Sequence, residues 1–372
     1  MIPFNKPYLT GNETRYIEEA VKSGKISGNG MFTQKCQTYF ESNYGFKKAL
    51  LTTSCTDALE MCAILANIQE GDEVIVPSFT FVSTAIAFVR QGAKIVFADS
   101  CADNPDIDVT KIEALITPKT KAIVPVHYAG VACDMDEIMF LANKYNLIVI
   151  EDAAQAIHSF YKGKALGSIG HMAAFSFHET KNIIAGEGGM LTINDDRFIP
   201  RAEVIWEKGT NRAEFFRGEV NKYGWVDIGS SFLPSEIIAA FLWAQIENIE
   251  NIQKKRLQHW HFYLEHLTEW ANKNGIQLMS ITDEATNNAH MFYLVCNSIA
   301  QRSALINHLK QNEVLAVFHY ISLHSSPFYI EKHDGRVLEN SDNFTDRLLR
   351  LPMYYELDVA SVVSKIKKYE SA

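Results

Sequence analysis

The chain has 372 residues, of which 47% are hydrophobic and 21% are charged, and its formal net charge is −9 at pH 7. This composition is typical of a soluble globular protein, and the length is sufficient for a large core and two domains. The acidic balance argues against a nucleic-acid-binding surface and against binding to an anionic membrane.

The N-terminus and the cysteines exclude further classes of protein. No basic segment followed by an apolar one opens the chain, and no run of about 18 apolar residues occurs, so we expect neither a signal peptide nor a membrane-spanning helix. The six cysteines are scattered without a Cys-x-x-Cys pair, which argues against a zinc site and against a disulfide framework. We therefore expect a cytoplasmic protein with reduced thiols and no metal.

The residue pattern at the start of the chain predicts a helix from about Asn12 to Ser23, a glycine-containing loop at 27–30, and a strand at 49–53. A helix opens directly after this strand, at Ser54, Cys55 and Thr56. The free N–H groups of such a helix start bind anions, and the two hydroxyls can add donors. A simple N-cap is the more common role of such a serine or threonine when it is considered alone.

Strands at 72–77, 93–99, 122–127 and 147–151 then alternate with helices. Their nearly continuous apolar runs are typical of a parallel sheet that is buried on both faces. Ligands bind at the carboxyl ends of such strands. The polar and aromatic residues that fall at these ends are Ser54, Phe81, His127 and Asp152.

The glycines give no sign of a dinucleotide site, because no Gly-x-Gly-x-x-Gly follows the first strand. The glycine-rich run at 185–189 instead precedes a short strand at 190–193. It fits either backbone that passes tightly beneath the loop that carries Lys181 or ordinary tight turns.

Lys181 and Asp152 indicate covalent carbonyl chemistry. Lys181 lies a few residues beyond a short apolar segment, with Ser176 five positions before it, and most lysines in such a place are solvated surface residues. Asp152, however, ends the strand at 147–151. An amine and an acid from neighbouring strand ends form the minimal apparatus of a pyridoxal 5′-phosphate (PLP) site, in which the amine bonds to the cofactor and the acid keeps its pyridine nitrogen protonated.

The pattern changes after residue 200. A helix at 201–209 leads into a loop at 210–227, and a long helical pattern covers 234–269. Strands at 291–295 and 316–320, with a helix at 303–311 between them and a last helix at the end, suggest a smaller α/β domain. We expect a large PLP-binding domain over residues 1–240 and a small C-terminal domain over 241–372.

Five ordered motifs lie between residues 54 and 182. They are residues 54–59, 77–85, 125–130, 151–155 and 176–182. In sequence and spacing they resemble the DegT/DnrJ/EryC1/StrS family of PLP-dependent sugar aminotransferases, and the likeness extends over essentially the whole chain. It implies the aspartate aminotransferase fold (PLP fold type I), an α/β fold with a mostly parallel sheet in the large domain and a smaller C-terminal α/β domain.

The resemblance also implies roles for single residues. Lys181 and Asp152 would be catalytic, with Lys181 bonded to the cofactor and Asp152 paired with its pyridinium nitrogen. Gln155 would lie beside the phenolic oxygen, and Phe81 would stack on the ring. The phosphate would be held by Ser54, Cys55, Thr56, Ser176 and, from the partner subunit of a homodimer, Ser231. Three positions depart from the family pattern, namely Cys55 for a glycine, Ser231 for an asparagine and Leu233 for an arginine.

Narrower motifs concern the substrate. Residues 209–212, 225–231, 289–293 and 318–324 are similar to the branch of the family that aminates dTDP-4-dehydro-6-deoxyglucose with L-glutamate as amino donor. A nucleotide-sugar diphosphate then needs local cationic or donor groups. The candidates are Arg212, Arg217, His319 and His324.

Three other functions stay open at this point. An aminotransferase for a 3-keto or a UDP-linked sugar would have the same cofactor residues. A PLP-dependent sugar dehydratase is disfavoured, because such relatives replace the lysine with histidine and Lys181 is present. A non-enzymatic interaction module on a degenerate fold is disfavoured by the intact Lys181, Asp152 and Gln155.

Overall fold

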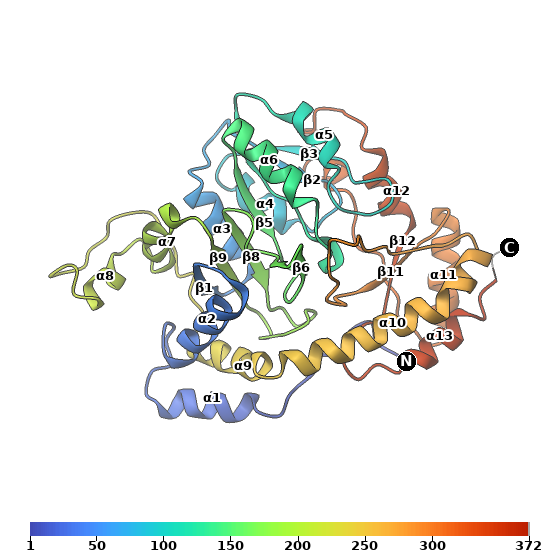
Figure 1. Cartoon of the computed structure of the whole chain (residues 1–372), viewed down its shortest axis with the longest axis horizontal. Coiled ribbons are helices and arrows are strands. Elements are labelled where there is room, and N and C mark those ends of the chain that lie inside the picture. Colours follow the sequence, from blue (N-terminus) through green and yellow to red (C-terminus); the bar gives the residue numbers. More distant parts are fainter. Residues whose placement is uncertain (371–372) are drawn as a thin grey trace.

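The computed structural model describes residues 1–370, and its largest element is one seven-stranded sheet in the order β1-β9-β8-β5-β4-β2-β3 (Figure 1). Strand β9 runs antiparallel to both of its neighbours, and the pairs from β8 to β3 are all parallel. The strands are β1 (Lys48–Thr52), β2 (Glu73–Pro77), β3 (Lys94–Ala98), β4 (Thr120–Ile123), β5 (Ile148–Asp152), β8 (Met172–Ser176) and β9 (Gly189–Ile193). The predicted mostly parallel sheet of the fold class is therefore confirmed.

Helices cover both faces of this sheet. Because successive side chains of a strand point to opposite faces, Ile75 and Val149 pack with α1, α2, α6 and α9, whereas Val76 and Ile150 pack with α3, α4 and α7. Burial on both faces is the reason that these strands are continuous apolar runs. The helices around the sheet are α1 (Glu13–Lys22), α2 (Met31–Tyr44), α3 (Cys55–Leu65), α4 (Ser83–Val89), α5 (Val109–Ile112), α6 (Met135–Tyr145), α7 (Ile199–Trp206), α8 (Arg212–Phe216) and α9 (Glu236–Ile246).

The C-terminal part is a smaller layer with its own core. Antiparallel strands in the order β10-β11-β12 pack against helices through a second apolar cluster. Two large-domain aromatics, Phe79 and Tyr128, join that cluster and connect the two parts. The elements are α10 (Ile249–Lys273), β10 (Gln277–Leu278), β11 (Phe292–Val295), α11 (Ile299–Gln311), α12 (Glu339–Arg347), β12 (Leu348–Leu351) and α13 (Val359–Ile366), and a separate hairpin of β6 (Phe160–Tyr161) and β7 (Lys164–Ala165) lies in the large domain.

Two element predictions in this region are wrong. Residues 316–320 form no strand; only Val317 makes a β-bridge, to Arg350, and the neighbouring strand is β12, over which the sequence predicted no element. The segment leaves the sheet because Tyr320 packs on Phe79 and Phe81 of the large domain. The helical pattern at 234–269 is two helices, because the chain leaves helical geometry at Asn248 between α9 and α10.

Helix α10 connects the two parts, as Figure 1 shows. Its first turns, at Ile249 and Ile252, belong to the core of the large sheet, and from Trp260 onward it belongs to the second core. The predicted division between residues 240 and 241 falls inside α9, which packs wholly with the large domain. That division stays a prediction, and we propose a boundary within α10. Ile2, at the other end of the chain, pairs with Val314 of the small domain.

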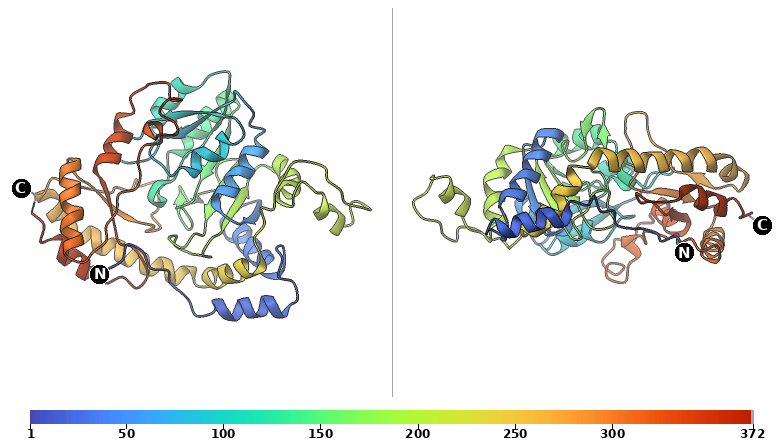
Figure 2. Two further views of the ribbon diagram at one scale, coloured as in Figure 1. Left: turned by 180° about the vertical axis from the view of Figure 1, so that it is seen from behind. Right: turned by 90° about the horizontal axis from the view of Figure 1, so that it is seen from below.

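Two further features of the structure bear on function, namely a projecting segment and the character of the helices. The segment that carries α8 projects from the large domain, at the end of the molecule opposite the two chain termini (Figure 2). Within residues 1–370, no helix is both long and apolar enough to cross a membrane.

Candidate active site

Lys181 and Asp152 reach the same edge of the sheet from adjacent parallel strands. Asp152 is the last residue of β5 and is aligned with Ala174 of β8, and Lys181 follows the end of β8 by five residues. The charge of Asp152 acts on the Lys181 amine and favours its protonated form. The predicted juxtaposition of an amine and an acid is therefore present.

Asp152 is a buried carboxylate without a cationic partner. It is 5% exposed, its Oδ2 accepts a hydrogen bond from Thr84 Oγ1 at 2.6 Å, and its Oδ1 accepts one from the Ala154 N–H at 3.2 Å. Burial raises its pKa, and these hydrogen bonds oppose the rise. No arginine, lysine or histidine within residues 1–370 forms an ion pair with it. A protonated pyridine nitrogen fits this acid, because it supplies the missing cation.

The Lys181 amine is poised for covalent chemistry. Its pKa is lowered to about 8, chiefly by burial and also by the positive charge of Arg350, while Cys55 and Asp152 act in the opposite direction. The residue as a whole is half-buried. The next residue anchors the loop, because Asn182 Nδ2 donates to Gln253 Oε1 at 2.8 Å and to the Asn288 carbonyl at 2.7 Å.

This lowered pKa predicts how the apo-enzyme captures PLP. Only the neutral amine attacks the cofactor's aldehyde, so the capture rate should rise about tenfold between pH 7 and pH 9 and then level off. Stopped-flow absorbance of apo-enzyme mixed with PLP measures this rate. A small-molecule lysine analogue is the control, and its rate should keep rising toward its ordinary pKa. An enzyme rate that follows the same course as the analogue would contradict the prediction.

Three of the residues predicted to bind the phosphate, Ser54, Cys55 and Thr56, lie at the start of α3. Ser54 is the N-cap, and its hydroxyl accepts the Asp57 N–H at 3.0 Å, so the N-cap role applies to it. Cys55 and Thr56 are first-turn residues, whose N–H groups have no helical acceptor and bind anions. The Thr56 hydroxyl lies 2.8 Å from Ser83 Oγ, and Ser176 ends the adjacent strand β8.

Gly189 is required where β9 passes this helix start. A Cβ at residue 189 would lie 2.3 Å from the Ser54 carbonyl carbon and 2.4 Å from the Cys55 nitrogen. The glycine run at 185–189 thus includes a tight backbone passage, and the backbone that it approaches is the turn into α3.

Replacing Gly189 with alanine should displace the start of α3 and weaken PLP binding. A phosphate held by main-chain N–H groups is sensitive to such a shift, so we expect an increase of about 30-fold in the PLP dissociation constant. Titration of apo-enzyme with PLP, followed by absorbance, measures it. Gly24→Ala, a glycine with open space around it and a positive φ, controls for loss of stability alone. Equal PLP affinity of both variants would contradict the prediction.

Gln155 and Phe81 are available to a bound ring. Gln155 Oε1 accepts the Ala129 N–H at 2.7 Å, which orients its NH₂ group. Burial raises the pKa of the Tyr320 hydroxyl, and hydrogen bonding by Gln155 lowers it with a smaller effect. Phe81 is 54% exposed although its ring centroid is only 5.8 Å from that of Tyr320. An exposed phenyl ring beside the reactive groups fits a stacking role.

Three predicted residues lie in the segment around α8 and do not meet Lys181 within one chain. Ser231 forms a β-bridge with Glu207 and is exposed. Arg212 is 3.9 Å from Glu207, and Arg217 binds Glu203 and Glu219 at 2.7 Å each. The two arginines thus contact carboxylates of their own surroundings, and Ser231 is held through its backbone.

His319 lies at the site, but as a neutral group. Its Nδ1 is 3.1 Å from Arg350 Nη1 and its ring stacks on Tyr320. Burial lowers its pKa to about 4, and the charges of Arg350 and Lys181 add to this effect. At neutral pH it therefore offers a hydrogen bond and no positive charge to a ligand.

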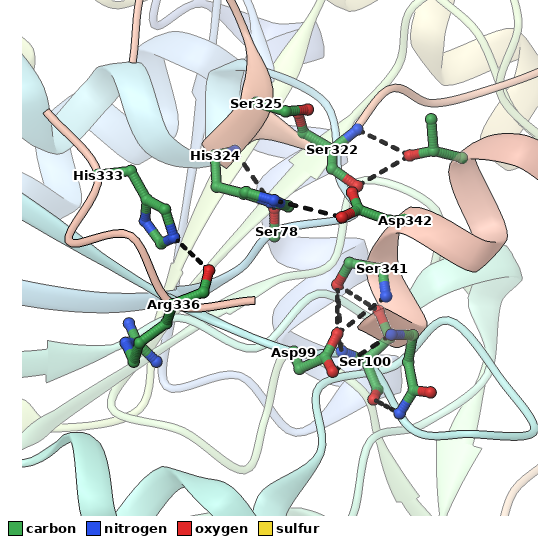
Figure 3. Close-up of polar contacts among 12 residues, drawn as sticks. Ser78, Asp99, Ser100, Ser322, His324, Ser325, His333, Arg336, Ser341 and Asp342 are labelled. Atoms are coloured by element: carbon green, nitrogen blue, oxygen red, sulfur yellow. Dashed lines mark hydrogen bonds and ion pairs between the residues drawn. The ribbon is translucent and has the colours of Figure 1, made fainter. Parts of the chain in front are cut away.

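His324 has a different surrounding, which Figure 3 shows. Its Nδ1 lies 2.7 Å from Ser78 Oγ and its Nε2 lies 3.5 Å from Asp342. Both ring nitrogens are thus occupied by protein atoms, and the contact with Ser78 holds the segment around residues 322–342 to the end of β2. These contacts give the predicted role in binding the nucleotide sugar no support.

Three residues of the site were missed by sequence reasoning. They are Thr84, which orients Asp152, and Tyr320 and Arg350, which come from the C-terminal part. Arg350 left one signal, because it is a lone charge in the apolar run Leu348-Leu349-Arg350-Leu351. The other two are unremarkable in sequence, and only the fold brings them to the site.

The protein has a mostly parallel sheet with a desolvated lysine and an acid without an ion-pair partner at its carboxyl edge. These features place it in the class of PLP enzymes with the aspartate aminotransferase fold. The model of the DegT/DnrJ/EryC1/StrS aminotransferase family matches residues 7–367, and the chain belongs to this family. The predicted family, fold and PLP cofactor are thereby confirmed.

Individual relatives agree with this assignment. GDP-perosamine synthase of Escherichia coli O157:H7 is 34% identical over 97% of this chain and 96% of its own. Spore coat polysaccharide biosynthesis protein SpsC of Bacillus subtilis is 32% identical over 98% and 96%. In fold, the chain is similar to the solved structure of a sugar aminotransferase from Streptococcus pneumoniae, Spr1654, with a TM-score of 0.91, 24% identity and coverage of 99% and 98%.

Proposed function

We propose that this chain is a nucleotide-sugar aminotransferase that transfers the amino group of L-glutamate to dTDP-4-dehydro-6-deoxyglucose. The products are dTDP-4-amino-4,6-dideoxygalactose and 2-oxoglutarate (the reaction of EC 2.6.1.59), and the enzyme acts in the cytoplasm in surface polysaccharide synthesis. The observation that carries the proposal is the half-buried Lys181, whose amine has a lowered pKa, at the same sheet edge as the buried Asp152, which has no ion-pair partner among the described residues.

Each residue has a distinct part in this reaction. PLP, when bound, supplies an electron sink for the charge that remains when a C–H bond of the substrate breaks. Asp152 holds the proton on the pyridine nitrogen, and the Cys55 and Thr56 N–H groups with Ser54 and Ser176 bind the phosphate. Lys181 Nζ would move a proton to and from the reacting carbon of the substrate.

A GDP-linked 4-keto sugar is the second candidate substrate, because relatives over 30% identical carry the name GDP-perosamine synthase. The dTDP-sugar is favoured by the narrower motifs at 209–212, 225–231, 289–293 and 318–324. The cofactor residues do not distinguish the two sugars, since both nucleotides lie outside the reacting centre.

Sequential spectroscopy tests the proposed function. L-glutamate added to the PLP-loaded enzyme should remove the visible absorbance of the cofactor, and dTDP-4-dehydro-6-deoxyglucose should then restore it. Restoration only by a GDP-linked or UDP-linked keto sugar would assign another substrate within the class. An absorbance that L-glutamate leaves unchanged would contradict the role of L-glutamate as amino donor.

The proposed enzyme is a homodimer whose subunits share their active sites. The segment that projects with α8 in Figure 2 carries apolar side chains that are open to solvent in the single chain. Their exposed fractions are 85% for Trp225, 69% for Phe216, 57% for Val226 and 54% for Ile228. Such a patch is typical of an interface, and Ser231 at its base would reach the partner's phosphate site.

Trp225→Ala should therefore weaken dimerisation, with an increase of about 30-fold or more in the dissociation constant, as expected for a central interface tryptophan. Sedimentation velocity over a range of concentrations measures it, and turnover should fall as the dimer dissociates. Phe140→Ala, which removes a 58% exposed aromatic side chain from α6, is the matched control. A monomer–dimer equilibrium that is equal in both variants would contradict the interface.

A further inference from the structure

The segment 322–342 of the C-terminal part is attached to the large sheet at two buried points, which Figure 3 shows. At the first point, His324 Nδ1 lies 2.7 Å from Ser78 Oγ, directly after β2. At the second point, Ser341 donates to Asp99 Oδ1, directly after β3, through its N–H at 2.8 Å and its hydroxyl at 2.9 Å. The two attachments are alike in burial, and they differ in what the chain carries after each strand.

Ser78 is bound to this segment through both its side chain and its main chain. Its hydroxyl oxygen accepts the His324 N–H at 3.3 Å, and its carbonyl accepts the Leu323 N–H at 2.9 Å. Because the hydroxyl oxygen accepts that N–H, its own proton goes to His324 Nδ1. The ring proton of the imidazole then lies on Nε2, which faces Asp342 at 3.5 Å. The imidazole therefore acts as an acceptor for Ser78.

The loop that begins at Ser78 leads to the cofactor site. The Ser78 carbonyl also accepts the Thr80 N–H at 3.1 Å. Thr80 Oγ1 lies 2.9 Å from Thr84 Oγ1, which donates to Asp152 Oδ2 at 2.6 Å. The same loop carries Phe81, the ring that is predicted to stack on the cofactor. A chain of hydrogen bonds therefore runs from the attachment at Ser78 to the acid of the site.

Phe81 depends on this loop because burial does not hold its ring. The side chain is 54% exposed, and its ring centroid is 5.8 Å from that of Tyr320. On the apolar side the loop is fixed by Phe79, which is 1% exposed and packs on Phe344. On the polar side it is fixed by the bonds of Ser78 to the segment 322–342. The direction of the exposed ring follows from these two supports.

The second attachment has no such continuation. Asp99 is followed by the loop to α5, and no residue of that loop is among those assigned to the cofactor. The segment 322–342 thus makes one attachment that leads to the cofactor and one that does not. A comparison of the two separates an effect on the site from an effect on general stability.

We propose that His324 is a positioning residue of the PLP site, which acts through Ser78 to hold the loop that carries Phe81 and leads to Asp152. The C-terminal part thereby supports cofactor binding through a residue that does not touch the cofactor. The proposal rests on PLP as the cofactor and is independent of which sugar and which amino donor the enzyme uses.

The test compares two amides that each replace one half of the imidazole. The oxygen of an asparagine takes the place of Nδ1 and accepts from Ser78, whereas the amide of a glutamine takes the place of Nε2 and reaches toward Asp342. Titration of apo-enzyme with PLP, followed by absorbance, measures the dissociation constant. We expect His324→Gln to raise it about tenfold, and His324→Asn to stay within about threefold of the wild type.

Ser341→Ala is the matched control, because it removes the buried hydroxyl of the second attachment. It should lower the melting temperature about as much as His324→Gln does and leave the PLP dissociation constant unchanged. The visible circular dichroism of bound PLP, which reports how the ring is held, should change in His324→Gln and not in Ser341→Ala.

Ser78→Ala tests the same contact from its other side and serves also if His324→Gln does not fold. It should weaken PLP binding about as much as His324→Gln. The double variant should be no weaker than either single variant, because both substitutions remove one interaction.

Three results would overturn the proposal. They are equal PLP affinity in His324→Gln and Ser341→Ala, PLP binding by His324→Asn as weak as that by His324→Gln, and additive losses in the double variant. A loss seen only with the keto sugar would assign His324 to the substrate instead. The titrations use PLP alone, so an error in the proposed substrates leaves their outcome unaffected.

Discussion

Replacing Lys181 with alanine is expected to abolish turnover, with a loss of about 10⁴-fold or more, as for removal of a covalent catalyst. The amine is the group of the site whose pKa burial lowers to about 8, so it is both the attachment point and the proton carrier of the proposed reaction. The variant should also lose the chromophore that borohydride reduces onto the protein. Assays of product formation and mass spectrometry after reduction measure the two losses.

The control for this substitution is Lys164→Ala, which removes an exposed lysine of strand β7. It should keep both full turnover and the reducible chromophore. The Lys181→Ala protein should still bind PLP noncovalently, because Asp152 and the start of α3 remain. Full turnover in the Lys181→Ala variant would show that Lys181 is not the residue that bonds to the cofactor.

The parallel order of strands is what made this pair predictable. Asp152 and Lys181 follow strands that read as apolar runs, and parallel strands bring such ends to one edge. Ser54 and Thr56, which follow the end of β1, were found by the same rule. Neither composition nor spacing gave the antiparallel direction of β9, because a short strand after a glycine run fits either direction.

The C-terminal half was less predictable because its site residues depend on contacts between the two domains. Tyr320 leaves the expected strand at 316–320 to pack on Phe79 and Phe81, and that packing overrides the strand propensity of the segment. His324, in the same stretch, is drawn to Ser78 rather than to the site. Arg350 reaches the centre only because β12 pairs with β11, a pairing between segments distant in the sequence.

Asp152 and its neighbour Glu151 provide the second large prediction, because two adjacent buried carboxylates have opposite tasks. The strand turns them to opposite faces of the sheet. Glu151 accepts from the Ile169 and Gly170 N–H groups at 2.9 and 2.6 Å through Oε1, and from the Gly167 N–H at 2.7 Å through Oε2. Its Oε2 also lies 2.9 Å from His127 Nε2. Glu151 is therefore saturated by protein donors, whereas Asp152 is not.

Asp152→Asn should retain the fold and PLP but lose about 10³-fold or more in both half-reactions. The amide oxygen can still accept from Thr84 Oγ1, so the melting temperature should change by only a few degrees. The neutral amide cannot hold the pyridine nitrogen in its protonated form, and the electron sink is lost with that proton. Single-turnover absorbance with L-glutamate measures the loss, and the bound PLP is quantified on the same sample.

Glu151→Gln should give the reverse result. One amide N–H₂ would face main-chain N–H donors in a fully buried position, which costs about 3–5 kcal/mol of unfolding free energy. Denaturant unfolding of the two variants side by side measures it, and activity per folded, PLP-loaded site should stay near that of the wild type. Equal catalytic losses in the two variants would mean that Asp152 acts through the structure rather than on the cofactor. The contrast between neighbours, one chemical and one structural, separates the role of Asp152 from the general effect of removing a buried charge.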